Sequence, residues 1–360
     1  MESIQYNSGI PCTGNASITR VNCSNISITT PSPTQGSTSQ LEWQVLCDYI
    51  VFYANPILIG FGLFFAIFNT IVVMSHARIS NDSYMMGLTI STAIMYICNG
   101  MLHFPDYVGY SEAFQHVFVY ILGGGEWFAY TALWLIVMAA LERCVNMMRH
   151  QGDTLCTSLQ ACITTIMIYM VCFVSTLPRY WEYEVGPTVD PATNNTFRKV
   201  MKSAAASGPE YSVYYFWYIL SFKLLLPFPL MLIMTIILCQ RIGHYRKRKI
   251  PSYRRDSTLI LLNRKLKEEI DISRLALGLL VTYLLLAGPY VIITAIPEVF
   301  PEALDKTSTL YSILFNFSQC SYYLNFSLQV ILFSCYSKSY RIAVARLCCD
   351  RCRNPDYEDY

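Results

Sequence analysis

Long apolar segments alternate with short polar connections along most of the chain. None of these segments shows the strict alternation of apolar and polar residues that a transmembrane β-strand would need. A helix needs about 20 mostly apolar residues to cross the hydrocarbon core of a bilayer, and each segment is near or above that length. The pattern predicts an all-α membrane protein, a bundle of seven transmembrane helices at about residues 49–74, 83–104, 114–141, 158–178, 211–239, 272–297 and 308–335.

Polar stretches at both ends divide the chain around this helical region. Residues 1–48 are rich in Ser, Thr and Asn, residues 49–337 contain the seven apolar segments, and residues 338–360 are again polar and charged. We interpret these parts as an N-terminal tail, a transmembrane domain, and a short amphipathic helix followed by a C-terminal tail. No basic leader precedes an apolar run near the N-terminus, so we expect no cleavable signal peptide.

Sequons and cysteines indicate the side of the membrane on which the N-terminal tail lies. N-linked glycosylation takes place only on the lumenal side, which becomes the extracellular side. We therefore expect an extracellular, glycosylated tail in a compartment where disulfides form. Cys12 and Cys23 are the candidates for a disulfide, although Cys47 leaves an odd count. The candidate glycosylation sites are Asn15, Asn22, Asn25 and, between the fourth and fifth segments, Asn194.

The charges favour the same orientation. Only 14% of the residues are charged, against about 25% in soluble domains, and 54% are hydrophobic. Arg and Lys concentrate in the connection between the fifth and sixth segments, and such basic loops stay on the cytoplasmic side. With the N-terminus outside and seven crossings, we predict a cytoplasmic C-terminus in a multi-pass protein of the plasma membrane.

The third segment carries charges near both of its ends, and we expect it to be the central helix. Glu126 lies within the apolar run, and Glu142-Arg143 follows where the run stops. An acid inside the membrane is costly and normally faces a bundle interior or a wet cavity. Lys223 lies within the fifth segment, so it either pairs with Glu126 or meets water separately. We predict ligand chemistry near one end of this helix and a charged switch at the other, with a plain interfacial ion pair at Glu142-Arg143 as the simpler alternative.

The region after the seventh segment predicts a short helix along the membrane surface. Over 338–347, apolar residues can contact lipid while Lys and Arg face the headgroups. Cysteines next to such a helix are candidates for palmitoylation. Zinc would need four ligands, and no further Cys or His follows these residues, so we expect no metal site. The palmitoylation candidates are Cys348, Cys349 and Cys352.

Motifs occur in a fixed order along the segments. The first segment contains Asn69 in Phe-Asn-Thr-Ile-Val-Val, and the third ends in Glu-Arg-Cys. Prolines interrupt the fifth and sixth segments, and the seventh ends in Asn-Phe-Ser-Leu-Gln-Val-Ile-Leu-Phe. Over about residues 49–350 this order and spacing resembles the rhodopsin-like, class A G-protein-coupled receptors. The resemblance assigns switch and G-protein-coupling roles to Glu142, Arg143, Pro227, Pro289, Asn325, Gln329 and Phe333.

Several positions depart from the class A pattern. Thr92, Ala132 and Gln329 replace residues that bind sodium in that family, and without a carboxylate there is no good site for a hard cation. Ala287 stands in place of the Trp of the sixth span. The usual disulfide to the third span is missing, because Phe118 occupies its position there and the connection over 179–210 contains no Cys.

The ligand is constrained by further comparisons within that family. Tyr323 occupies the place of the retinal lysine of opsins, and Gly125 the place of the amine-binding Asp of aminergic receptors. The run over 177–184, Leu-Pro-Arg-Tyr-Trp-Glu-Tyr-Glu, resembles a run in invertebrate FMRFamide-type and myosuppressin-type peptide receptors. Acids near this end either attract a cationic peptide or form a solvated rim. The candidate ligand-binding residues are Glu126, Arg179, Glu182, Glu184, Lys223, Tyr290, Tyr322 and Tyr323.

The resemblance implies a receptor in which an extracellular ligand and a heterotrimeric G protein prefer the same state. The first hypothesis is a neuropeptide receptor, and the alternative is a divergent chemosensory receptor of the same fold. A transporter or channel is a third hypothesis, disfavoured because the two halves show no repeat. The chain lacks a P-loop, a metal-ligand cluster and a nucleophile-base arrangement. We therefore expect no enzymatic activity, no cofactor and no nucleic-acid partner; the expected partners are ligand, G protein and lipid bilayer.

Overall fold

The computed structural model describes residues 49–76, 80–104, 112–148, 157–189, 196–247, 257–300 and 308–348. All of them belong to the unit Glu42–Tyr360. The predicted disulfide of Cys12 and Cys23 lies outside these residues, as do the four candidate sequons and Cys349 and Cys352.

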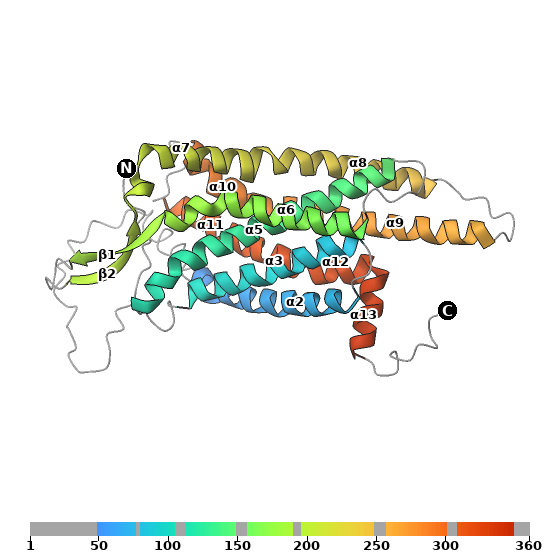
Figure 1. The fold of residues 1–360 in the computed structure, drawn as a ribbon, viewed down its shortest axis with the longest axis horizontal. Coiled ribbons are helices and arrows are strands. Elements are labelled where there is room, and N and C mark those ends of the chain that lie inside the picture. The colour runs from blue at the N-terminus through green and yellow to red at the C-terminus, as the bar shows by residue number, and fades with distance from the viewer. Residues whose placement is uncertain are drawn as a thin grey trace, which may run out of the picture. The chain divides into compact units, whose positions relative to one another are not determined.

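Helices run along the chain in the order that the apolar segments predict (Figure 1). The predicted all-α helix bundle is confirmed, and the short helix after the seventh span is present as α13. The first four spans contain η1 (Ile50–Ala54), α2 (Asn55–His76), α3 (Ser80–His103), α5 (Glu112–Met148), α6 (Ser158–Thr176) and η2 (Leu177–Trp181). The last three spans and the short helix contain α7 (Pro209–Trp217), η4 (Tyr218–Leu225), α8 (Pro227–Lys247), α9 (Ser257–Thr282), η5 (Tyr283–Ala287), α10 (Gly288–Val299), α11 (Thr309–Ser327), α12 (Gln329–Tyr336) and α13 (Lys338–Cys348).

Six helical stretches in the described residues are long and apolar enough to cross a membrane. The seventh predicted span forms α11 and α12, which are separated at Leu328. This span is less apolar than the others, because α11 contains Ser, Asn and Gln side chains that bond inside the bundle. Asn55 at the start of α2, fully buried, donates to Gln319 Oε1 at 3.3 Å, and the thiol of Cys320 donates to Asn55 Oδ1 at 3.1 Å.

Two prolines break the regular helix in the fifth and sixth spans. Each follows a π-helical stretch: η4 ends just before Pro227, and η5 ends just before Gly288 and Pro289. Proline has no N–H, and its ring clashes with the preceding turn, so it is tolerated in the first turn of a new helix. The expected interruptions therefore occur where the sequence places them, and a wider turn precedes both.

An antiparallel hairpin, which the sequence pattern did not predict, lies between the fourth and fifth spans. Its strands are β1 (Tyr183–Val189) and β2 (Thr196–Lys202), and Tyr183 is opposite Lys202. Both strands contact α5, at the end of the bundle opposite α13 (Figure 1). These strands are too short to be found by a search for membrane-spanning lengths, although both contain β-branched and aromatic residues, which favour strands.

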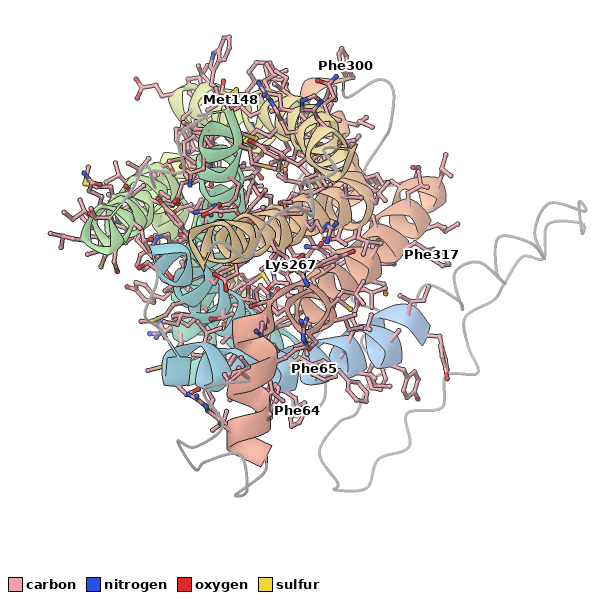
Figure 2. All side chains as sticks on the ribbon, turned by 90° about the vertical axis from the view of Figure 1, so that its right-hand side faces the viewer. Phe64, Phe65, Met148, Lys267, Phe300 and Phe317 are labelled. Carbon is pink, nitrogen blue, oxygen red and sulfur yellow. The ribbon has the colours of Figure 1, made fainter. Side chains whose placement is uncertain are left out.

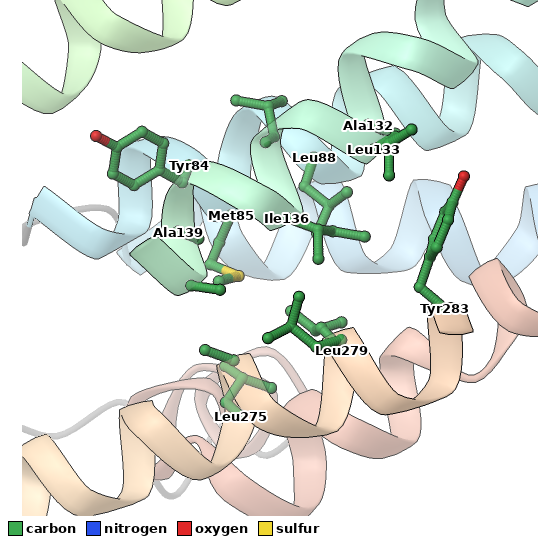
Figure 3. Packing of buried hydrophobic residues seen from close by; sticks show 14 of the residues in the cluster. Tyr84, Met85, Leu88, Ala132, Leu133, Ile136, Ala139, Leu275, Leu279 and Tyr283 are labelled. Atoms are coloured by element: carbon green, nitrogen blue, oxygen red, sulfur yellow. The ribbon is translucent and has the colours of Figure 1, made fainter. Parts of the chain in front are cut away.

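The third span is the centre of the bundle, as predicted. Helix α5 contacts α3, α6, α8 and α9, and 61% of its membrane-length window is buried, against 17–44% for the other five stretches. Leu133 and Ile136 of α5 pack with Leu88 of α3 and with Leu279 and Tyr283 of the sixth span (Figure 3).

The outside of the bundle carries large apolar side chains that suit a lipid environment. Phe64 of α2 is 64% exposed and Phe317 of α11 is 49% exposed, and both lie at the periphery (Figure 2). In a membrane protein these side chains contact acyl chains, so they need no protein partner.

Candidate functional site

Glu126 is the centre of a polar cluster inside the bundle. Its Oε1 accepts hydrogen bonds from Lys223 Nζ at 2.5 Å and from the Tyr130 hydroxyl at 3.0 Å. Its Oε2 accepts one from Arg179 Nε at 2.5 Å. Tyr130 can reach the carboxylate because residues four apart lie on one face of a helix. The pair that the sequence left open, Glu126 with Lys223, is therefore formed, and Arg179 joins it.

Arg179 links this carboxylate to a second acid. It lies in η2, a short 3₁₀ helix with Pro178 near its start, and Glu182 follows at the C-terminal end of this helix, three residues after Arg179 and on the same side. Arg179 Nη1 bonds to Glu182 Oε2, and Glu182 is buried. A buried charge is tolerated when it is paired, and removing one partner of such a pair costs about 3–5 kcal/mol. The four charges of Glu126, Arg179, Glu182 and Lys223 thus stabilise one another.

This pairing bears on both alternatives for Glu182, contact with a cationic peptide or a place in a solvated rim, and ligand contact by Glu182 stays a prediction. Its carboxylate faces Arg179 inside the protein rather than the extracellular mouth. Glu184, two residues further along on β1, is exposed and keeps the position expected of a rim residue. Two further acids that the sequence places near this end are Glu298 and Glu302, and their side chains lie outside the described part of the chain.

Aromatic rings surround the two cations of the cluster. Lys223 Nζ lies 4.9 Å from the Tyr130 ring centroid and 5.3 Å from that of Tyr218. The Arg179 guanidinium carbon lies 4.9 Å from the Tyr215 centroid. Cations are attracted to aromatic faces at these distances. The tyrosine-rich start of the fifth span, which the sequence analysis did not single out, therefore forms part of the cluster.

Facing aromatic pairs continue from the cluster along α5 and the fifth span. Tyr130 and Tyr218 have centroids 5.7 Å apart, and one helical turn further on Trp134 and Phe222 are 5.3 Å apart. We name the charged residues Glu126, Arg179, Glu182 and Lys223, with Tyr130 and Tyr218, the outer cluster.

The tyrosines predicted in the sixth and seventh spans form a separate group. The Tyr290 and Tyr322 rings lie 4.8 Å apart, and the Tyr322 hydroxyl donates to Met95 Sδ at 3.5 Å. Tyr323 is buried, and its hydroxyl donates to Asn99 Oδ1 of α3 at 3.1 Å. Tyr323 thus contributes to packing between α3 and α11; ligand contact by all three tyrosines stays a prediction.

At the opposite end of α5, Arg143 contacts two acids. Nη2 lies 2.7 Å from Glu142 Oε1, and Nη1 lies 3.1 Å from Glu269 Oε2 of α9. Arg143 and Glu142 are buried, whereas the Glu269 side chain is 38% exposed. The predicted pair of neighbours is present, and Glu269 extends it to the sixth span.

Glu269 was not among the predicted site residues, because this acid lies in a long charged stretch that we interpreted as a basic loop. Helix α9 in fact begins at Ser257, well before the apolar segment, so this stretch is helical and partly packed. The signal available in the sequence was a pair of acids, Glu268-Glu269, within an otherwise basic run next to the sixth span.

The end of the seventh span packs against α13. Asn325, Gln329 and Phe333 are buried, and the Phe333 ring lies 5.5 Å from that of Tyr340. Tyr340 donates its hydroxyl to Asn69 Oδ1 of α2 at 2.5 Å. Burial raises the pKa of Tyr340, so the hydroxyl keeps its proton and remains a donor.

The described residues do not group three His, Cys, Asp or Glu side chains as a metal site would require. Thr92 instead donates to the carbonyl of Leu88 within its own helix, at 2.8 Å. The side-chain nitrogen of Gln329 is buried and has no hydrogen-bond partner among the residues that the structure describes.

The helix bundle has a paired polar cluster near one end of its central helix and an arginine bonded to the sixth span at the other, an arrangement that fits the G-protein-coupled receptor that the sequence predicts. The family model of the serpentine type 7TM GPCR chemoreceptor Srw matches residues 110–351, about two thirds of the 360-residue chain. The chain belongs to this family. Comparison with curated proteins gave no match.

Family membership establishes a multi-pass membrane receptor, which in this class acts through an extracellular ligand and a G protein, and the family is not one of enzymes. The closer likeness to class A and FMRFamide-type receptors stays a prediction.

Proposed function

We propose that the protein is a chemosensory receptor of the plasma membrane that binds a small extracellular molecule at the outer cluster and activates a heterotrimeric G protein. This is the alternative hypothesis of the sequence analysis, and the description of the family as chemoreceptors supports it over a neuropeptide receptor. The N-terminus faces outward in this proposal, with the basic connection between spans five and six in the cytoplasm.

The observation that carries the proposal is the double contact of Arg143. By bonding to Glu142 on its own helix and Glu269 on α9, it holds the inner ends of the third and sixth spans together. A G protein that needs Arg143 competes with both acids, since the guanidinium cannot satisfy all partners at once. Ligand binding at the outer cluster activates the receptor to the extent that the ligand prefers the state in which this contact is open.

The outer cluster also explains why a cationic peptide is the weaker hypothesis. Glu126 and Glu182 are both paired with Arg179, and Glu126 also with Lys223. Of the acids considered for a peptide, Glu184 alone is both exposed and within the described ranges. Single rim charges contribute little affinity.

The proposal is tested in cells that report calcium and cyclic AMP, with the receptor tagged so that its amount at the surface is known. Glu142→Gln removes the buried partner of Arg143, so signalling without ligand should rise above that of the unaltered receptor. Arg143→Ala should lower it in the same background. If neither substitution changes reporter output at equal surface expression, the receptor mechanism proposed here is wrong.

A further inference from the structure

The outer cluster has more hydrogen-bond donors than acceptors. Each oxygen of Glu126 already accepts at least one hydrogen bond, and Oε1 accepts two. Lys223 carries three N–H donors, and its hydrogen-bond acceptor among the described residues is Glu126 alone. The other sides of its ammonium face the Tyr130 and Tyr218 rings, which attract a cation but accept no conventional hydrogen bond.

Two further donors in the same region have no hydrogen-bond partner within the described ranges of the chain. Tyr218 is 6% exposed, and its hydroxyl is buried without a hydrogen bond. The Trp134 indole N–H, one turn beyond Tyr130 on α5, is also buried and unpaired. A buried polar group without a partner costs about 1–3 kcal/mol, so such groups call for an explanation such as an absent bound molecule.

The charged groups are not completely enclosed. The side chains of Glu126 and Lys223 remain 13% and 14% exposed, although both lie well inside their spans, and Arg179 is 11% exposed. Lys223 and Tyr218 supply unused donors next to these groups, while Trp134 and Phe222 offer an apolar surface one turn further on.

From this geometry we infer that the ligand is a small organic acid, whose carboxylate accepts hydrogen bonds from Lys223 and Tyr218 and whose body packs against Trp134 and Phe222. The inference rests on the proposed function, because it specifies the ligand of the same site. A carboxylate supplies the acceptors that the cluster lacks, and as a charged acceptor it forms a stronger hydrogen bond with the Lys223 ammonium than a neutral group does.

An amine ligand does not fit this arrangement. To reach Glu126 it would have to displace Lys223, which would leave a second ammonium in the membrane without a partner. It would also add a third positive charge next to Lys223 and Arg179. A neutral amide keeps one acceptor but forms a weaker hydrogen bond with an ammonium than a carboxylate does, so it should bind more weakly than the matching acid.

The first experiment compares matched ligands on reporter cells carrying the full-length receptor. Hexanoate, benzoate and phenylacetate are applied beside their primary amides and beside hexylamine, benzylamine and phenethylamine. We expect at least one acid to change reporter output at a concentration at least tenfold below that of its amide, with no response to the amines. Cells without the receptor control for effects of the acids on the cell itself.

Two variants then locate the carboxylate. Lys223→Gln removes the charged donor, and Tyr218→Phe removes a hydroxyl that forms no hydrogen bond with the residues that the structure describes. Each should weaken the potency of the active acid about tenfold or more, and weaken that of the amide less, because the amide forms the weaker hydrogen bonds with these donors. Tyr120→Phe is the matched control, because Tyr120 is a 65% exposed tyrosine on the same helix as Glu126.

The outcomes separate this assignment from the proposed function. If Glu142→Gln and Arg143→Ala change basal signalling but the acids are silent, or the amines or amides are more potent, the acid assignment is overturned and the receptor mechanism stands. An active acid whose potency is unaffected by both Lys223→Gln and Tyr218→Phe overturns it as well. If the basal signalling of the two switch variants is also unchanged, the proposed function fails with it.

Discussion

Replacing Glu269 with Gln tests the contact between the third and sixth spans in its simplest form. The change keeps the size of the side chain and removes the charge that Arg143 contacts at 3.1 Å. Exposed ion pairs contribute about 0.2–1 kcal/mol. Arg143 is buried while Glu269 is 38% exposed, so we expect a loss near the upper limit, about 1 kcal/mol. That is about a fivefold shift of the equilibrium toward the active state.

Signalling without ligand should therefore rise about fivefold if the resting receptor is mostly inactive. The measurement is reporter output per receptor at the cell surface, across a range of expression levels. Lys267→Gln is the matched control, since it removes a charge from an exposed residue of the same helix, labelled in Figure 2, and should not raise the basal signal. A basal signal equal to that of the unaltered receptor for Glu269→Gln would refute the idea that this contact restrains activation.

Three further predictions concern the rest of the fold. Arg143→Ala, with its amount at the cell surface confirmed, should abolish most of the response to an active ligand. Ligand binding should stay intact, because about 17 residues of helix, near 25 Å, separate Arg143 from Glu126. Full signalling by this variant would contradict the switch assignment. Glycan mapping should find sugar on at least one of the three N-terminal sequons or on Asn194. It should find none on Asn81, which is also in a sequon (Asn-Asp-Ser) but lies at the start of α3, on the expected cytoplasmic side. Sugar on Asn81 would contradict the proposed orientation. Tyr340→Phe should destabilise the purified receptor by about 1–2 kcal/mol in thermal unfolding, because Asn69 loses its buried donor. The control Tyr336→Phe, at a 37% exposed position, should have little effect. Equal melting temperatures for the two variants would show that the hydrogen bond to Asn69 does not stabilise the fold.

The sequence predicts the spans well because a membrane helix must be about 20 apolar residues long, and that length is visible without any knowledge of packing. It fails where polar residues continue a helix beyond the membrane. The predicted sixth span begins at 272, but α9 begins at Ser257, because charged residues can be helical in water. The same charged stretch contains Glu269, so one error in the helix boundary also concealed a partner of Arg143.

The site was predicted in part, for a related reason. Glu126 and Lys223 stand out because a charge inside an apolar segment is rare, and their pairing follows from the cost of leaving either alone. Arg179 and Glu182 lie at the end of a span, where charges are common, so nothing in the sequence separates an internal pair from a solvated rim. Their pairing depends on the short 3₁₀ helix η2, which contains Pro178. The contact of Tyr218 with Lys223 depends in turn on the wider turns of η4. Both are features of backbone geometry that hydropathy does not report.

The hydrogen bonds between α2 and α11 bear on how the receptor is made. Helix α2 emerges early in synthesis and α11 near its end, yet Asn55 of the first bonds to Gln319 and Cys320 of the second. Amide groups are costly in the hydrocarbon core when they have no partner. Until α11 has been translated, the Asn55 amide therefore needs water or another temporary hydrogen-bond partner. The hydrogen bonds of the first span are accordingly completed only when the last and least apolar span is in place. Truncations that remove the last span leave the Asn55 amide of the first span without these partners.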